Sequence, residues 1–383
     1  MEETGYRVER ALLRHVRVPM REPFRISNGI VSEKESIVLE LHSGGFIGYG
    51  EASPMSGSFY SSETPETTWN ALANDLIPDL FTRTIRNPVE YAELLSAYTQ
   101  EPFARAGIEG AVWHLQAAKL GTTIRELLGA PRAEILSGLA VGICDTIDEL
   151  LDRIALYLKD GYQRVKIKIM PGWDIVPLTA IRSRFGDIPL MVDANAAYDL
   201  ETHRNILLSL DRFGLMMLEQ PLAANALNDM AELALAMKTP ICVDESADSM
   251  IALEEIIRLA AASIVNIKVQ RVGGLWNATR ILARAREAGL GCWLGTMPEL
   301  GIASAQALAI ASLPGFVYPT DIEASERWFT DDILDPPISI SDRGAIVFPD
   351  RGLLENEPQE HGPIEYEVDT LKLERYTIRK QEF

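Results

Sequence analysis

Three acidic residues recur at nearly constant spacing, and each of them follows a short apolar run. Asp193, Glu219 and Asp244 stand about 25 residues apart, the length of one strand-plus-helix unit, so we expect them on successive strands of one parallel sheet. One such residue alone is as often a helix cap or an ion-pair partner. Three in consecutive units favour a site for a hard divalent cation, because carboxylate oxygens are the ligands that Mg²⁺ prefers.

Lysines flank this acidic series on both sides. Lys166 and Lys168 stand two residues apart in VKIKI, so on a strand both side chains face the same way. A lysine that lies beside a second cation and partly out of water has a lowered pKa and can act as a base near neutral pH. Lys268, in NIKVQ, lies four units further along the chain. We therefore expect a base on each side of one substrate carbon atom.

Two polar neighbours join the predicted site. Asn195 stands two residues after Asp193 and so faces the same side of a strand. Glu245 directly follows Asp244, and we interpret it as a hydrogen-bond partner of the ligands.

The elements that position these residues follow the pattern of a barrel. From residue 131 to 327, short apolar runs alternate with helical stretches such as TIDELLDRIALYLKDG. Eight such units predict a closed (β/α)7β-type TIM barrel, an α/β fold whose active site forms at the carboxyl ends of the strands. The runs are LAVGIC, RVKIKI, PLMVDAN, LMMLEQP, PICVDES, SIVNIKV, GCWLGT and FVYPTD.

The segments on either side of the barrel show other patterns. Residues 1–130 begin with strand patterns around the hairpin signal Gly44-Gly45 and continue with helical patterns, which predicts an N-terminal α+β capping domain. Residues 328–383 are rich in turns, and we expect this C-terminal segment to pack back on the capping domain.

Composition limits the partners. The chain has 383 residues and an apolar fraction of 47%, enough for a large buried core. A net charge of −19 repels phosphate backbones and anionic lipid headgroups, so we expect neither nucleic acid nor a membrane as partner. The three cysteines lie far apart in apolar stretches and the N-terminus has no targeting pattern, which predicts a cytoplasmic location. We also expect a homo-oligomer, because such barrels often form symmetric assemblies.

Five motifs occur in a fixed order along the predicted barrel: K-x-K, D-A-N, E-Q-P, D-E-S and N-I-K-x-x-R-V-G-G. In this order they resemble the enolase superfamily, in its muconate lactonizing enzyme subgroup. The resemblance extends from PFRISNG near the start of the chain to EASERWFTDDI after the barrel. Within the subgroup, the sequence is most similar to the o-succinylbenzoate synthases and the N-succinylamino acid racemases.

The resemblance implies roles for the residues named above. It places Mg²⁺, for which Mn²⁺ can substitute, on the three carboxylates. It makes Lys168 and Lys268 the acid and base, gives Lys166 an electrostatic role, and adds Arg271 and Glu245 as supporting residues. The implied reaction removes a proton α to a carboxylate of a small-molecule substrate. It either dehydrates 2-succinyl-6-hydroxy-2,4-cyclohexadiene-1-carboxylate, a step of menaquinone biosynthesis, or racemises N-succinylamino acids.

Other reactions of the same subgroup stay open. The main activity can be N-acylamino acid racemisation, muconate cycloisomerisation or dipeptide epimerisation. Dipeptide epimerases have a D-x-D signature at the eighth strand, where this chain has Asp321-Ile322-Glu323. A mandelate-racemase-type enzyme is disfavoured, because it needs a histidine on the seventh strand and GCWLGTMPELG has none. We expect substrate contacts from the capping loops and the last two strands, with the candidates Arg25, Ser27, Thr296, Met297, Glu299, Asp321 and Glu323.

Overall fold

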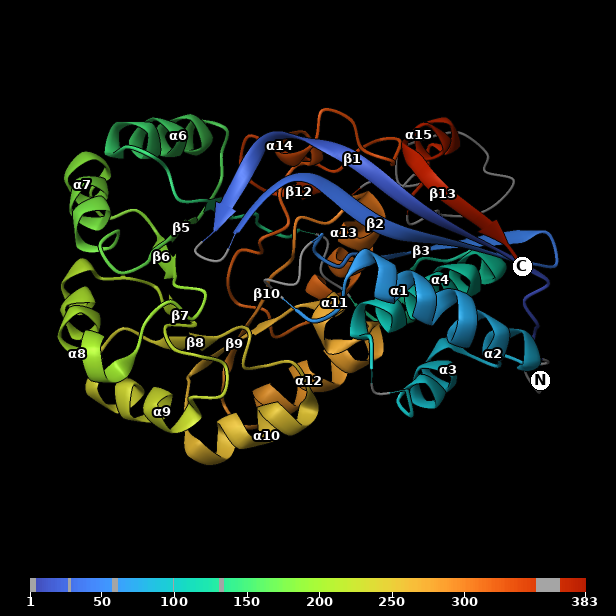
Figure 1. Ribbon diagram of the computed structural model, residues 1–383, viewed down its shortest axis with the longest axis horizontal. Coiled ribbons are helices and arrows are strands. Elements are labelled where there is room, and N and C mark those ends of the chain that lie inside the picture. Colours follow the sequence, from blue (N-terminus) through green and yellow to red (C-terminus); the bar gives the residue numbers. More distant parts are fainter. Residues whose placement is uncertain (1–4, 27–28, 57–60, 99, 131–133, 349–365) are drawn as a thin grey trace.

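The computed structural model describes residues 5–26, 29–56, 61–98, 100–130, 134–348 and 366–383. These residues form an antiparallel sheet in the order β13-β1-β2-β3 and a parallel sheet in the order β10-β9-β8-β7-β6-β5-β4, with helices around both (Figure 1). A two-stranded sheet of β11 (Ser339–Ile340) and β12 (Ile346–Val347) is separate from both.

The antiparallel sheet joins strands from both ends of the chain. β1 (Arg10–Ile26) pairs with β2 (Gly29–Ser43), and β2 pairs with β3 (Phe46–Ala52). β13 (Thr377–Glu382) pairs with β1, so the C-terminal segment packs on this sheet. The domain boundaries after residues 130 and 327 stay predictions.

Helix α4 lies closest to the antiparallel sheet. Gly48 and Gly50 of β3 allow this approach, because a Cβ on Gly50 would stand 2.0 Å from the carbonyl oxygen of Gly107. A π-helical segment, Leu72–Leu76, joins the first two helices. The helices of this region are α1 (Pro65–Ala71), α2 (Ile77–Thr82), α3 (Pro88–Leu95), α4 (Pro102–Leu120) and α5 (Ile124–Leu127).

Short, mostly buried strands alternate with helices in the parallel sheet, as a barrel requires. The strands are β4 (Leu139–Val141), β5 (Val165–Lys168), β6 (Leu190–Asp193), β7 (Leu218–Glu219), β8 (Ile241–Val243), β9 (Ile264–Ile267) and β10 (Gly291–Leu294). The helices are α6 (Ile147–Lys159), α7 (Ile175–Phe185), α8 (Leu200–Ser209), α9 (Leu227–Ala236), α10 (Met250–Leu259), α11 (Val269–Val272), α12 (Leu275–Glu287), α13 (Gly301–Ala311), α14 (Ser325–Trp328) and, after the barrel, α15 (Thr370–Tyr376). A 3-10 turn, Leu210–Phe213, extends α8.

The eighth predicted strand, FVYPTD, is not a regular strand in the structure. This segment closes the ring through two isolated parallel bridges, Cys292 with Phe316 and Ser137 with Thr320. Pro319 has no amide hydrogen to donate to a neighbouring strand, which explains the interrupted ladder. The barrel prediction is confirmed, but the parallel sheet has seven regular strands where the sequence predicted eight.

Two layers of side chains fill the barrel. Strand alternation directs the lysines and carboxylates inward at the carboxyl ends, above an apolar layer of Met191, Met217, Cys242, Ile264 and Trp293. In the described part of the chain, no helix is long and apolar enough to cross a membrane.

Candidate active site

The three predicted carboxylates lie side by side at the carboxyl ends of β6, β7 and β8. Asp193 stands directly opposite Glu219 in the β6–β7 pairing, and Asp244 follows the last residue of β8. At most 1% of the surface of any of these residues is exposed. Asp193 and Glu219 are the last residues of their strands, and Asp244 is the first residue after β8. The structure therefore brings together the residues whose spacing suggested one site.

Three lysines contact this carboxylate row, and two of them share Asp193. Lys168 Nζ donates a hydrogen bond to Asp193 Oδ2 over 2.6 Å, and Lys268 Nζ donates to Asp244 Oδ2 over 2.9 Å. Lys166 Nζ lies between them, 3.1 Å from Asp193 Oδ2 and 2.8 Å from Glu219 Oε2. Lys168 and Lys268 thus approach the row from opposite ends.

Two polar residues near the row were not foreseen as site residues. Asn266 Nδ2 donates to Glu219 Oε1 over 2.7 Å, and the side chain of Gln220 accepts hydrogen bonds from the backbone amides of Asp244 and Ser246. The signal for Asn266 was present, since it is the one polar residue in an apolar strand and stands two positions before Lys268.

Three further predicted residues, Arg271, Asn195 and Glu245, lie around the row. Arg271 forms an ion pair with Asp244 Oδ1 and donates to the carbonyl oxygen of Asn266 over 2.7 Å. Asn195 lies in the left-handed region, with φ 42°, and donates its side-chain amide to Glu245 Oε1 over 3.1 Å. Burial, followed by the charge of Asp244, raises the pKa of Glu245 to about 7.

The pKa shifts of the charged residues in the row differ in direction. Burial, together with the charge of Asp193, raises the pKa of Glu219 to about 8. Burial also opposes the charge of Asp244, but Arg271 and Lys268 more than offset it and lower the pKa. Burial likewise opposes the charge of Lys166, yet the surrounding carboxylates raise its pKa well above the usual value.

The donor set of the row fits a hard divalent cation. Three carboxylates are buried at neighbouring strand ends, and Glu219 Oε2 accepts no hydrogen bond from the described residues, although the Lys166 ammonium faces it. As the side chains stand, no three His, Cys, Asp or Glu residues among those described form a group that could hold a metal ion, and the carboxylates instead face ammonium and guanidinium groups. The ligand assignment stays a prediction.

The candidates on the seventh unit lie beside the capping domain. Met297 is packed in the apolar cluster of that domain, and its amide donates to Glu299 Oε1 over 3.2 Å. Burial, with the charge of Glu51, raises the pKa of Glu299 to about 8, so this carboxyl is largely protonated at neutral pH. The hydroxyl of Thr296 donates to the carbonyl oxygen of Asp321 over 3.3 Å.

The predicted substrate contacts on the eighth unit, Asp321 and Glu323, interact with other protein groups. Asp321 accepts hydrogen bonds from Arg164 (2.7 Å) and from Lys166 (2.9 Å), one on each carboxylate oxygen. Glu323 Oε1 accepts from the backbone amide of Ala140 over 2.8 Å, and its Oε2 lies 3.5 Å from Arg327 Nε. Neither carboxylate presents a free pair of oxygens for a substrate ammonium.

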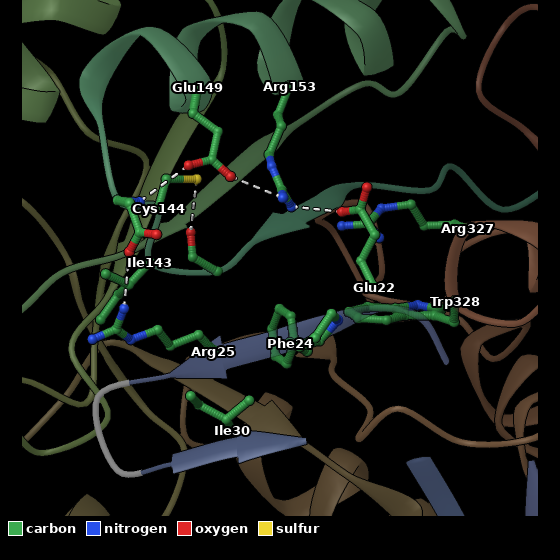
Figure 2. Close-up of a pocket in the computed structure, with 13 residues that line it drawn as sticks. Glu22, Phe24, Arg25, Ile30, Ile143, Cys144, Glu149, Arg153, Arg327 and Trp328 are labelled. Atoms are coloured by element: carbon green, nitrogen blue, oxygen red, sulfur yellow. Dashed lines mark hydrogen bonds and ion pairs between the residues drawn. The ribbon is translucent and has the colours of Figure 1, made fainter. Parts of the chain in front are cut away.

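Arg25 lines a cavity of about 210 Å³ between the β1–β2 hairpin and α6 (Figure 2). Figure 2 shows its side chain reaching across the cavity to the loop after β4, where it forms a 3.1 Å ion pair with Asp145. Its carbonyl oxygen accepts a hydrogen bond from the amide of Ile143 over 3.0 Å. A Cβ on Gly142 would stand 2.6 Å from the same oxygen.

The β4–β5 register relates this cavity to the lysines. Val141 stands opposite Ile167, so the next position, Gly142, is level with Lys168. The hairpin backbone at Arg25 therefore covers the barrel beside the strand end that carries Lys168. Ser27, the other candidate on the hairpin, lies outside the described residues.

Comparison with known proteins gives family matches over most of the chain. Residues 9–129 match the family model "Mandelate racemase / muconate lactonizing enzyme, N-terminal domain", and residues 149–353 match "Enolase C-terminal domain-like". An o-succinylbenzoate synthase of Geobacillus kaustophilus is 41% identical over 97% of this chain and 96% of its own. An N-succinylamino acid racemase of Amycolatopsis sp. is 40% identical over 85% of this chain and 88% of its own. A crystal structure of an enolase superfamily member from Listeria innocua superposes with a TM-score of 0.90 at 32% identity, covering 99% of both chains.

Proposed function

Because the chain belongs to the mandelate racemase/muconate lactonizing enzyme family of the enolase superfamily, whose members generally need a divalent metal, we propose that it removes a proton α to a substrate carboxylate with Mg²⁺ as cofactor. The reaction is that of an o-succinylbenzoate synthase, a carbon–oxygen lyase of menaquinone biosynthesis, with N-succinylamino acid racemisation as a second activity. Relatives of both kinds support this proposal.

One observation carries the proposal more than any other. Lys168 and Lys268 hold the two ends of a buried carboxylate row, on strands that lie four positions apart in the ring. A substrate carbon above the row has an amine on each face. Racemisation needs this arrangement, because one group removes a proton and another returns one to the opposite face.

In the proposed mechanism, Asp193, Glu219 and Asp244 would hold a divalent cation, which would supply positive charge to offset the charge that develops on the substrate carboxylate. Lys168 Nζ takes the α-proton. In dehydration, hydroxide leaves the β-carbon and Lys268 stays protonated, which stabilises the developing negative charge. In racemisation, Lys268 Nζ delivers a proton to the other face.

Charged residues around the row hold the carboxylates in position. Lys166 stays cationic between Asp193 and Glu219, since the surrounding carboxylates raise its pKa. Arg271 holds Asp244 from outside the row.

Arg25 is the residue we propose for the distal carboxylate that both substrates share. Its ion pair with Asp145 is exposed, with 49% and 83% of the two side chains accessible, so little free energy is lost when Asp145 is exchanged for a substrate carboxylate. We expect Arg25→Met to lower kcat/KM for an N-succinylamino acid about tenfold. The same variant should leave an N-acetylamino acid, which lacks the distal carboxylate, almost unaffected.

The control for this prediction is Arg153→Met. Arg153 lies in the same cavity but is held by Glu22 and Glu149, so its loss should loosen the hairpin and affect both substrates alike (Figure 2). An Arg25→Met variant that loses equal activity on both substrates would contradict the role of Arg25.

Metal removal is a further prediction. Dialysis against a chelator should abolish both activities, because the α-proton is too weakly acidic for a lysine alone, and Mg²⁺ or Mn²⁺ should restore them. Asp244→Asn should prevent this restoration at metal concentrations that saturate the native enzyme. Full activity of the chelated protein would rule the mechanism out.

The choice among substrates is tested by measuring kcat/KM side by side for the synthase substrate, N-succinylamino acids and dipeptides. We expect the first two to be turned over and dipeptides to be poor substrates, because Asp321 and Glu323 are held by other protein groups. A dominant dipeptide activity would overturn this order. The cytoplasmic location and the homo-oligomer stay predictions.

A further inference from the structure

One tryptophan lies directly beneath the carboxylate row. Trp293 of β10 is fully buried in the apolar layer of the barrel, and its indole N–H donates to Cys242 Sγ over 3.2 Å. Lys166 Nζ stands 4.9 Å from the centre of its ring, and Arg164 Cζ stands 5.2 Å from it. Both distances lie within the range of cation–π attraction, which is strongest where the cation is out of water.

The same two cations share one carboxylate. Asp321 accepts a hydrogen bond from Arg164 on one oxygen and from Lys166 on the other. Arg164 itself is 1% exposed and also donates to the carbonyl oxygen of Pro319 over 3.0 Å, so this assembly is fixed to the segment that closes the ring. The Lys166 ammonium thus has the indole and Asp321 on one side and the carboxylate row on the other.

A lysine side chain has four rotatable bonds, and burial by itself does not select one conformation. A flat aromatic face of fixed position limits where the ammonium can stand. We propose that Trp293, with Asp321, is a positioning residue that holds Lys166 between Asp193 and Glu219, and so sets the geometry of the proposed metal ligands without touching substrate. This inference rests on the proposed function in that Asp193 and Glu219 are taken to hold the cation.

The test compares two substitutions at Trp293 with a control in the same layer. Trp293→Phe keeps an aromatic face and loses the N–H, whereas Trp293→Leu loses the face. Met217→Ala, in the same apolar layer, creates a cavity but leaves the ion pairs of Lys166 and its contact with the Trp293 ring in place. Mg²⁺ affinity is measured by isothermal titration calorimetry, kcat and KM are measured separately, and crystal structures give the position of Lys166.

We expect Trp293→Leu to weaken Mg²⁺ binding about tenfold and to lower kcat more than it raises KM, with Lys166 displaced. Trp293→Phe and Met217→Ala should stay within about threefold of the native enzyme. The proposal is overturned if Trp293→Leu leaves Lys166 in place, or if Met217→Ala weakens Mg²⁺ binding as much. If the native enzyme bound no Mg²⁺, the proposed function would fail, while the position of Lys166 in the crystal structures would still decide the role of Trp293.

Discussion

We expect Lys168→Ala to lower kcat for both dehydration and racemisation at least about 10³-fold, because it removes the group that takes the α-proton. Lys168 is 7% exposed and donates a short hydrogen bond to Asp193, so water has little access to act as the base in its place. The measurement is single-turnover kinetics with each substrate at saturating Mg²⁺.

Lys168→Arg serves as the matched control. Arginine keeps a positive charge beside Asp193 but does not give up its proton in proteins. This variant should bind Mg²⁺ like the native enzyme and yet be as inactive as Lys168→Ala. Appreciable turnover in either variant would show that Lys168 is not the base.

Lys268→Ala has the second largest expected effect. It should lower racemisation at least about 10³-fold, because the face opposite Lys168 then has no proton donor. In D₂O, one enantiomer of an N-succinylamino acid should still exchange its α-proton, through Lys168, and the other should not. Proton NMR of each pure enantiomer measures this difference.

Lys268→Arg separates charge from proton transfer at this position. It should keep much of the dehydration, which needs only a cation there, and lose racemisation. Equal exchange rates of both enantiomers in Lys268→Ala would contradict a model with one base on each face.

The sequence was sufficient to predict which residues meet at the centre of the site. Acidic residues at the ends of consecutive strands of a parallel sheet must converge, and the alternation of Lys166 and Lys168 places both inside the barrel. Periodicity and spacing determine these positions, and both can be read from one chain.

The surroundings of the site could not be predicted in the same way. Asp321 was a candidate for substrate contact, yet it pairs with Arg164 and Lys166, which are more than 150 residues away in the chain. The choice of partner for a buried charge depends on which strands close the ring and at what register. The interrupted eighth strand could not be predicted for a similar reason. Pro319 has no N–H, and whether this breaks a strand depends on whether a neighbouring strand needs a donor at that position.

In the proposed site, Lys168 removes the α-proton of a substrate held at a metal-loaded row of carboxylates, with Lys268 on the opposite face. The most direct measurement follows the α-proton of an N-succinylamino acid in D₂O by NMR, with native enzyme and Mg²⁺. We expect both enantiomers to exchange deuterium into the α-position, and we expect a chelator to stop this exchange. Absence of exchange in either enantiomer from the Mg²⁺-loaded native enzyme, or exchange that continues without metal, would contradict this mechanism.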